Sequence, residues 1–281
     1  MKPKFKLKFL LSAAAVVCAA VFGLVFYGAY RGNASVDVSR DFVKIIDVGQ
    51  ADCILIYSGG CSALIDTGLA SSTDEVAEAL DSAGIKTVDV LMLTHMHDDH
   101  AGGFELISQQ YGIDNLILPD YEFDKGSYTS ASDRIYTAKQ GMNFEIGRFE
   151  ITLLAEYGDL PEENDRSVFV MAENSGKKFL FTGDAGKRAE ERLLEERINI
   201  DCDVLKAGHH GSDSSLAKEF LAAASPEYAA ISVGENNSYS HPSPETLSAL
   251  GNCGAEILRT DKNGDITFYV ENGEIKAETE K

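Results

Sequence analysis

The chain has 281 residues and a formal net charge of −20 at pH 7. Hydrophobic residues make up 44% of it and charged residues 25%, which is typical of a globular protein and excludes a disordered one. So large an acidic excess also argues against broad, non-specific nucleic-acid binding, because such binding needs a positively charged surface.

The first thirty residues differ from the rest of the chain. Lysines at positions 2, 4, 6 and 8 precede an uncharged apolar stretch, residues 9–30, whose 22 residues are enough to cross a bilayer. Because basic flanks stay in the cytoplasm, we expect a cytoplasmic segment 1–8, a transmembrane anchor 9–30 and an extracellular remainder. A cleaved signal sequence is the alternative, since small residues at 28–29 and 33–34 offer cut sites, and it predicts a secreted protein.

A polar linker, residues 31–41, leads into one predicted domain of residues 42–281. Residues 32–281 hold all 45 acidic side chains and 20 of the 25 basic ones, so the acidic excess belongs to this part. Its four cysteines show no CxxC spacing, and both two disulfides and buried free thiols are compatible with the sequence. They are Cys53, Cys61, Cys202 and Cys253.

The first half of the domain is rich in predicted strands. A strand over 42–50 is followed by two strands within 53–68, joined in a hairpin across Ser58-Gly59-Gly60. A helix over 71–85 has Ser72 or Thr73 as its N-cap. A strand over 87–95, a helix over 101–110 and a strand over 115–119 come next. Residues 119–142 read as an inserted loop with a helix near 131–140, and strands over 143–146 and 149–155 follow.

The second half begins with a hairpin over 167–184 that turns at residues 174–176 and then alternates helices with strands. Helices are expected over 185–198, 214–224 and 243–254, and strands over 203–208, 228–234, 256–260 and 265–270. Two mixed β-sheets packed face to face with helices outside account for this order, so the predicted class is an α+β fold, an αββα sandwich.

The stretch THMHDDHAGG, residues 94–103, concentrates three of the six histidines directly after a strongly apolar strand. His95 and His97 are two residues apart and point to one side of an extended segment. Asp99 and His100 follow at a helix start, where the turn brings them round to face the first pair. Imidazole and carboxylate groups in such a pattern are typical ligands of Zn²⁺, Mn²⁺ or Fe.

The remaining histidines and one aspartate also follow predicted strands. Asp184 ends a hairpin strand, His209 and His210 follow the strand at 203–208, and His241 lies between a strand and a helix. Each alone is a weak signal, but loops that converge at one edge of a sheet would bring all of them together.

These features resemble the metallo-β-lactamase superfamily and, within it, the soluble hydrolase domain of ComEC-type competence proteins. The markers span about residues 42–270 of the chain. They are DVGQADCILI (47–56), LIDTG (64–68), LTHMHDDHAGG (93–103), NDRSVFV (164–170), FLFTGDA (179–185), DVLKAGHHGS (203–212) and HPSP (241–244).

The resemblance implies a site for one or two metal ions, Zn²⁺ or alternatively Mn²⁺, at the edge shared by the two sheets. It implies that His95 and His97 bind one ion, that Asp99 and His100 bind the second, that Asp184 bridges both and that His209 completes the second site. Many superfamily members carry another histidine before the strand that leads to the Gly-Asp turn. This chain has Asn164 and Asp165 there, so Asp165 or Asn164 completes the first site, or that site is weak.

The predicted function is an extracytoplasmic metal-dependent hydrolase, most favourably a phosphodiesterase or nuclease that uses a metal-bound hydroxide. Asp99 would orient the nucleophile, and His210 or His241 would donate to the leaving oxygen or bind phosphate. The expected substrate is DNA or a small phosphodiester, and the N-terminal helix would contact the membrane. Alternatives are hydrolysis of a choline-phosphate ester, a lactone or a lactam, and a non-catalytic tethered binding module with the same fold.

Overall fold

The computed structural model describes residues 36–121 and 125–281, and the folded unit comprises Asp37–Lys281. The expected cytoplasmic segment 1–8 and membrane anchor 9–30 lie outside the described residues. Within the described ranges, none of the helices combines the length and the apolar character that a membrane span requires.

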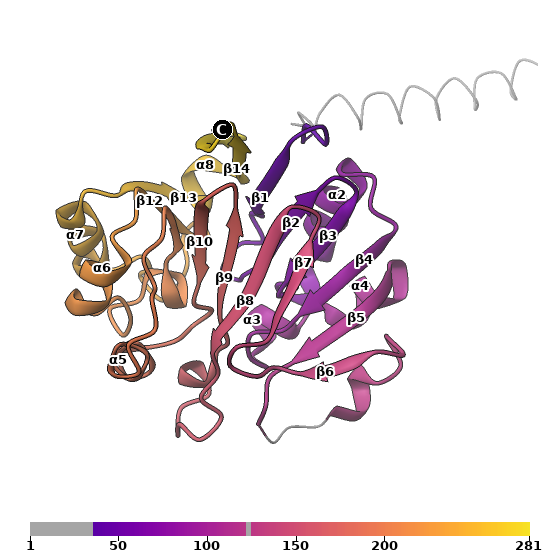
Figure 1. The fold of residues 1–281 in the computed structure, drawn as a ribbon, viewed down its shortest axis with the longest axis horizontal. Coiled ribbons are helices and arrows are strands. Elements are labelled where there is room, and N and C mark those ends of the chain that lie inside the picture. The colour runs from indigo at the N-terminus through magenta and orange to yellow at the C-terminus, as the bar shows by residue number, and fades with distance from the viewer. Residues whose placement is uncertain (1–35, 122–124) are drawn as a thin grey trace, which may run out of the picture. The chain divides into compact units, whose positions relative to one another are not determined.

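The folded unit contains two mixed β-sheets (Figure 1). The first sheet has eight strands in the order β15-β14-β1-β2-β3-β4-β5-β6. Its strands are β1 (Asp41–Ile45), β2 (Ile54–Ser58), β3 (Cys61–Ile65), β4 (Thr87–Met92), β5 (Gly112–Leu118), β6 (Ile135–Thr137), β14 (Ile266–Glu271) and β15 (Glu274–Thr279). The hairpin predicted across Gly59 and Gly60 is present as the antiparallel pair β2–β3.

The second sheet has seven strands in the order β13-β12-β11-β10-β9-β8-β7. They are β7 (Asn143–Ile146), β8 (Phe149–Ala155), β9 (Phe169–Asn174), β10 (Lys177–Phe181), β11 (Val204–Lys206), β12 (Tyr228–Ile231) and β13 (Glu256–Arg259). The neighbours β10, β11, β12 and β13 run parallel, so their carboxyl ends lie at one edge of the sheet.

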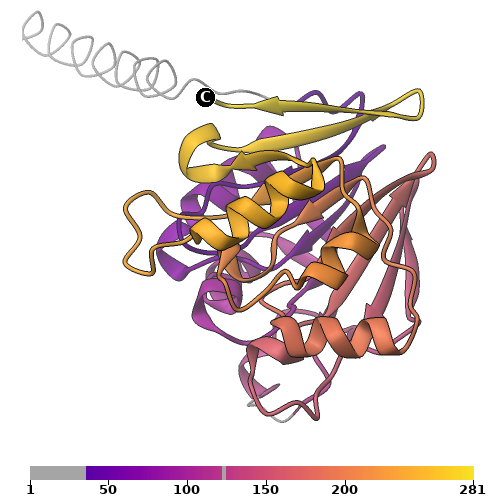
Figure 2. The same ribbon diagram turned by 90° about the vertical axis from the view of Figure 1, so that its left-hand side faces the viewer.

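Helices lie outside the two sheets, as Figures 1 and 2 show. The α-helices are α2 (Thr73–Ser82), α3 (Asp98–Ala101), α4 (Phe104–Gln110), α5 (Lys187–Glu195), α6 (Lys218–Ala224), α7 (Pro244–Cys253) and α8 (Thr260–Asn263). Short 3₁₀ turns cover Ala70–Ser72, Lys125–Tyr128, Asn164–Arg166 and Gly208–Gly211. The predicted αββα sandwich is therefore confirmed.

Two apolar cores hold the layers together. Between the sheets, the rings of Phe149 and Phe268 lie 6.0 Å and 6.3 Å from the ring of Phe179, so aromatic contacts run from one sheet to the other. On the outer face of the second sheet, Phe220 of α6 and Leu250 of α7 are fully buried with residues of β10, β11 and β12. Burial of such apolar surface is the main driving force for this packing.

The predicted helix near 131–140 is wrong, because residues 135–137 form strand β6. Ile135, Tyr136 and Thr137 are β-branched or aromatic, and they pair in parallel with residues 116–118 of β5. The sheet edge thus overrides the weak local helix signal. The structure also adds α8 and the terminal strand β15, which the sequence pattern missed.

The four cysteines of the described ranges are all free. Cys53 and Cys202 are buried, Cys61 is partly buried and Cys253 is exposed. Of the two arrangements that the sequence left open, the structure has free thiols.

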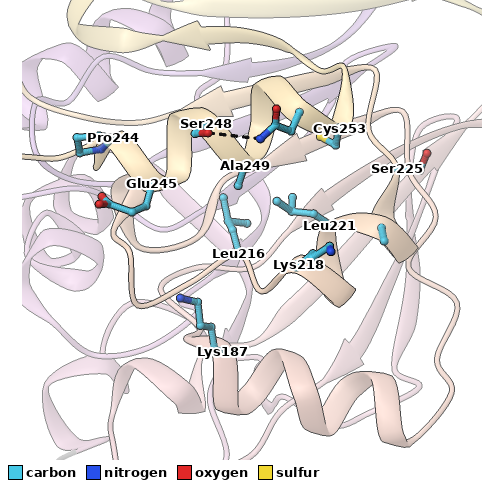
Figure 3. A pocket seen from close by; sticks show the side chains of 12 residues that line it. Lys187, Leu216, Lys218, Leu221, Ser225, Pro244, Glu245, Ser248, Ala249 and Cys253 are labelled. Carbon is cyan, nitrogen blue, oxygen red and sulfur yellow. Dashed lines mark hydrogen bonds between the residues drawn. The ribbon is translucent and has the colours of Figure 1, made fainter.

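A groove of about 930 Å³ lies between α6 and α7 (Figure 3). Its walls include the apolar side chains of Leu216, Leu221 and Ala249, and Lys218 also lines it. Lys187, at the start of α5, lines both this groove and the polar pocket described below, so the two adjoin at α5.

Glu190 of α5 is a buried carboxyl outside the polar pocket, and its titration predicts how stability depends on pH. Its two oxygens accept hydrogen bonds from the backbone N–H groups of Leu216 and Ala217, each at 2.7 Å. Burial nevertheless raises the pKa of Glu190 from 4.5 to about 7. Since the folded chain keeps this proton while the unfolded chain releases it, the contribution of Glu190 to the free energy of unfolding falls as the pH rises from about 4.5 to 7.

Glu190→Gln removes this titration, so we expect the stability advantage of the unsubstituted chain over the variant to be larger at pH 5 than at pH 7.5. Between pH 5 and pH 7.5 this stability advantage should shrink by up to about 3 kcal/mol. Urea denaturation of both proteins at the two pH values measures it. An advantage that stays constant between pH 5 and 7.5 would contradict the prediction.

Candidate metal centre

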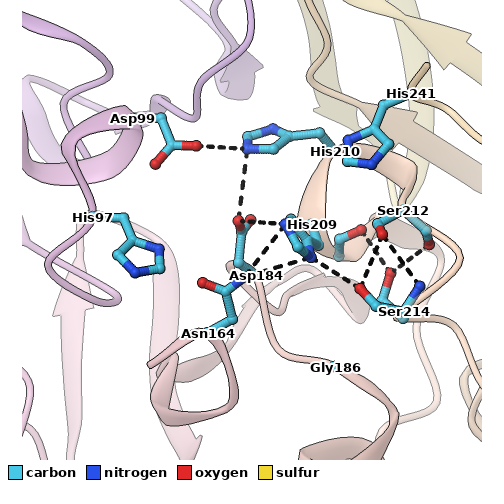
Figure 4. A network of polar contacts seen from close by, with 12 residues as sticks. His97, Asp99, Asn164, Asp184, Gly186, His209, His210, Ser212, Ser214 and His241 are labelled. Atoms are coloured by element: carbon cyan, nitrogen blue, oxygen red, sulfur yellow. Dashed lines mark hydrogen bonds and ion pairs between the residues drawn. The ribbon is translucent and has the colours of Figure 1, made fainter. Parts of the chain in front are cut away.

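The predicted ligands come together because the segments that carry them meet at one edge of the sandwich. The loop after β4 leads into α3 and carries the HxHxDH residues, whereas Asp184 follows β10, His209 and His210 follow β11, and His241 follows β12. Because β10, β11 and β12 are parallel neighbours, the last three loops leave the sheet at the same edge. Figure 4 shows the resulting network of His and Asp side chains.

Four side chains form the centre of this network: Asp99, His100, Asp184 and His210. One ligand atom from each lies within 4.8 Å of the others. Nε2 of His100 is 3.2 Å from Oδ1 of Asp184, and Nε2 of His210 is 3.2 Å from Oδ2 of Asp99 and 3.7 Å from Oδ2 of Asp184. All except Asp99 are buried. The structure therefore gathers the predicted second metal site, with His210 as its fourth member.

His210 lies deeper in the site than His209, the residue that the resemblance implied as a ligand. His210, expected at the leaving group, is 2% exposed and turned into the centre, whereas His209, expected as the ligand, lies beside it. Nε2 of His209 is 3.7 Å from Oδ2 of Asp184, but its Nδ1 contacts Oγ of Ser214 at 2.9 Å (Figure 4). Both histidines have positive φ, 48° and 52°, so the local backbone departs from a strand or helix and does not follow their periodicity.

The His95–His97 side of the site is more open. His95 is fully buried, with its ring 4.1 Å from that of His100 and 4.8 Å from that of His97. His97 is exposed, and its Nε2 lies 3.7 Å from a carboxylate oxygen of Glu163. The two histidines thus lie next to the central group but leave one side facing the pocket.

Asn164 and Asp165 both line the pocket on the His97 side. Asp165 accepts a hydrogen bond from the backbone N–H of Gly186 at 3.0 Å, which occupies one carboxylate oxygen in holding that turn. Nδ2 of Asn164 lies 3.3 Å from Nε2 of His209, and its buried Oδ1 has no hydrogen-bond partner. Both residues that the sequence offered for the first site line this wall of the pocket, and the unpartnered Oδ1 favours Asn164.

Asp66 supports His100 from behind, although the sequence pattern did not single it out within LIDTG. It is buried, its Oδ2 is 2.8 Å from Nδ1 of His100, and its two oxygens accept from the backbone N–H and the hydroxyl of Thr94. An acceptor at Nδ1 keeps the proton there and leaves Nε2 of His100 free to face Asp184. The signal for Asp66 was its place at the end of β3, at the same sheet edge as the ligands.

Asp52 and Lys206 form a second buried support below His210. Nζ of Lys206 lies 2.7 Å from Oδ2 of Asp52, and both side chains are almost fully buried. Nδ1 of His210 lies 3.1 Å from the carbonyl oxygen of Ser232 and 3.5 Å from Oδ1 of Asp52. These acceptors leave Nε2 of His210 directed at Asp99 and Asp184. A lysine inside an otherwise apolar strand was the signal for this pair.

The electrostatics of the centre favour cations. Burial alone would lower the pKa of His100 and His210, but the carboxylates around them outweigh it. Asp184 and Asp66 hold the pKa of His100 well above its ordinary value, and Asp184, Asp52 and Asp99 raise the pKa of His210 to about 9. A metal ion must displace these protons before it can bind the histidine nitrogens. The metal affinity of the site is therefore expected to fall as the pH falls.

The donor set fits a metal ion. Among the described residues, the buried Nε2 of His95 has no hydrogen-bond partner, and the buried Nε2 of His100 and Oδ1 of Asp184 contact each other as an ion pair at 3.2 Å outside hydrogen-bond geometry. Burying an unpaired nitrogen is costly, so a ligand at this point would account for its retention. Burial and the nearby His100 lower the pKa of His95 well below its ordinary value, which keeps its imidazole neutral and able to donate a lone pair. Nitrogen and oxygen donors of this kind suit Zn²⁺, Mn²⁺ or Fe.

His241 lies at the mouth of the pocket rather than in the metal-ligand group. Its Nδ1 is 3.4 Å from Nε2 of Gln50, and its ring centre is 5.6 Å from that of His209. The Gln50 amide donates to Nδ1, which leaves the proton of the His241 ring on Nε2. The expected place of His241 near the site, outside the metal-ligand group, agrees with this geometry.

Comparison with known proteins places these observations in a family. The family model described as "Metallo-beta-lactamase superfamily" matches residues 46–235. ComE operon protein 3 of Bacillus subtilis is 30% identical in an alignment that covers 96% of this chain and 37% of that protein. Competence protein ComA of Neisseria gonorrhoeae is 31% identical over 263 residues, 92% of this chain and 36% of that protein. The chain thus spans about a third of the length of these relatives.

A solved structure supports the fold independently. The metallo-beta-lactamase fold protein YhfI from Bacillus subtilis matches 82% of this chain and 99% of its own, with a TM-score of 0.56 and 12% sequence identity. At that identity the likeness concerns the fold alone.

Proposed function

This chain belongs to the metallo-β-lactamase superfamily, and on that premise we propose that it is a metal-dependent hydrolase that cleaves phosphodiester bonds. The observation that carries the proposal is the convergence of Asp99, His100, Asp184 and His210 beside the buried, unpaired Nε2 of His95. A non-catalytic module would have no need to keep so costly an arrangement.

In this proposal Asp99, His100, Asp184 and His210 hold one ion. His95 and His97 with Asn164 would hold the other, and Asp184 would serve both. When bound, such ions make water a nucleophile near neutral pH and withdraw negative charge from a phosphoryl oxygen. We propose Zn²⁺ as the native ion, because imidazole and carboxylate donors suit it. Mn²⁺ is the alternative, because an amide oxygen in place of an imidazole favours the harder cation.

The other residues of the pocket position the substrate and manage its protons. His241 keeps a hydrogen on Nε2, because Gln50 occupies Nδ1, and it can donate a hydrogen bond to a leaving oxygen or a phosphoryl oxygen. Lys187 and Arg188 line the pocket on the Asn164 side, where they can neutralise a phosphate. His209, between these two sides, is placed to hydrogen-bond a phosphoryl oxygen.

A substrate panel with the full chain, purified in detergent, tests the proposal. We expect Zn²⁺- or Mn²⁺-dependent hydrolysis of bis-p-nitrophenyl phosphate, loss of activity with a chelator, and recovery when the ion returns. Nitrocefin and p-nitrophenyl phosphorylcholine examine the lactam and choline-ester alternatives in the same assay. Failure to bind any transition metal, or turnover of nitrocefin alone, would overturn the phosphodiesterase proposal.

The proposed location is the outer side of the membrane. It rests on the lysines at positions 2–8 and the apolar stretch 9–30 alone. Protease treatment of intact cells that carry a C-terminally tagged chain tests it, since an external domain loses the tag.

Asp66→Asn should weaken metal binding by about 10- to 100-fold, the usual cost of removing a partner that orients a ligand. In the variant the amide NH₂ of residue 66 has to face either the N–H of Thr94 or Nδ1–H of His100. One of these two donors therefore loses its acceptor. Titration against a fluorescent Zn²⁺ chelator measures the affinity. Asp89→Asn is the matched control, because that carboxylate accepts from Ser62 N–H outside the metal site, and equal affinities for the two variants would contradict the prediction.

A further inference from the structure

Tyr239 stands out at the rim of the metal pocket. Its side chain is 68% exposed, more than any other large hydrophobic residue within the described ranges. It nevertheless lines the same pocket as His97, Asp99 and Asp184. An exposed aromatic ring at the rim of a polar pocket offers a flat π-surface to a ligand that enters that pocket.

The ring is held in place rather than left free. Tyr239 stacks on His241, with ring centres 5.7 Å apart and planes inclined by 27°. The loop beneath is closed by Asn237, whose Oδ1 accepts from the backbone N–H groups of Tyr239 and His241 at 3.2 Å and 3.0 Å. Gln50 in turn fixes His241 and accepts from Gly234 N–H at 3.1 Å. One face of Tyr239 is thus covered by His241, and the exposed remainder is presented on a rigid support.

We propose that Tyr239, backed by His241, is a stacking platform for a nucleobase next to the scissile phosphodiester, so that the substrate is a nucleotide or short single-stranded oligonucleotide. The inference rests on the proposed phosphodiesterase function. Stacking suits a single flat aromatic face, because every base offers a π-surface of the same kind. A duplex is disfavoured, since its bases are already stacked inside the helix.

Charge sets the length of this substrate. The side of the pocket lined by Tyr239 contains no lysine or arginine, and the two basic residues of the adjoining side, Lys187 and Arg188, are accompanied by Glu162 and Glu163. With a net charge of −20, the chain repels a long polyanion. One or two phosphates beside the metal centre and one stacked base are what this pocket accommodates.

Hydrolysis of two matched substrates tests the platform: a thymidine tetranucleotide and its abasic analogue, which has the same phosphates without bases. We expect the full chain to prefer the base-containing substrate by about 5- to 150-fold in kcat/KM, the worth of one stacked base. Tyr239→Ala should abolish most of that preference, because it should lower kcat/KM for the base-containing substrate by a much larger factor than for the abasic one. Tyr239→Phe should retain it, and Tyr136→Ala, at another exposed tyrosine, serves as the surface control.

The outcomes separate the platform from the hydrolase. An undiminished preference in Tyr239→Ala, or an equal loss for both substrates, overturns the platform even if hydrolysis is observed. If neither substrate is cleaved, the phosphodiesterase proposal fails, and calorimetric binding of the same two compounds decides the platform. Tighter binding of the base-containing compound that Tyr239→Ala removes supports it, and equal binding of both compounds refutes it.

Discussion

Asp184→Asn is expected to lower phosphodiester hydrolysis by about a thousandfold or more and to reduce the metal content of the purified protein. Asp184 is the carboxylate on which the cluster converges: its Oδ1 lies 3.2 Å from Nε2 of His100, and its Oδ2 lies 3.7 Å from His209 and His210. Loss of one group that stabilises developing charge costs about 10²–10³ in kcat in other hydrolases, and a group shared by two ions should cost at least as much.

The substitution preserves the shape of the side chain, so its effect reports on charge. Burial would raise the pKa of Asp184, but His210 and His100 hold that pKa well below its ordinary value, and the group is therefore a carboxylate at neutral pH. An amide brings a neutral NH₂ donor into a set of metal ligands. Metal analysis by mass spectrometry and the initial rate with bis-p-nitrophenyl phosphate measure the two effects.

Asp133→Asn provides the control for this experiment. Asp133 is exposed in the segment before β6, and the same change of charge there should leave rate and metal content unaltered. Circular dichroism of Asp184→Asn verifies the fold. A folded Asp184→Asn protein with its full complement of metal and an unchanged rate would contradict the metal-centre assignment.

The sequence predicted those site residues whose positions follow from the end of a predicted strand. His95, His97, Asp99, His100 and Asp184 were found because each follows a predicted strand, and the structure places them together. Which of His209 and His210 lies deeper in the site was not predictable in this way. Both residues have left-handed backbone geometry, so neither the two-residue period of a strand nor the 3.6-residue period of a helix says which side chain points inward.

The supporting residues were missed for a different reason. Asp52, Asp66 and Lys206 belong to different strands or strand ends, and only the packing of the sandwich brings them under the histidines. Their charge in apolar surroundings was visible in the sequence, but their partners were not. The wrong helix near 131–140 has the same origin, because β6 exists only where β5 offers a free edge.

Breaking the buried pair of Asp52 and Lys206 is expected to have the largest effect on stability. Burial would raise the pKa of Asp52, but the neighbouring Lys206 ammonium holds it far below its ordinary value, which shows how closely the two charges depend on each other. Lys206→Met or Asp52→Leu alone leaves a buried charge without its partner and should cost about 3–5 kcal/mol of unfolding free energy. The double substitution removes both charges and should cost much less than the sum.

Guanidinium denaturation with a chelator present measures this cycle, since metal binding to the folded state would otherwise add to the stability. Lys177 and Asp203 supply a matched control: they are 2.8 Å apart, but each side chain is 23% exposed, so Lys177→Met should cost only about 0–1 kcal/mol. Additive losses at Asp52 and Lys206 would contradict the coupling. A double variant that is stable but no longer binds metal tightly would show that the pair is not needed for folding. The charge of Asp52 would then be required to orient His210.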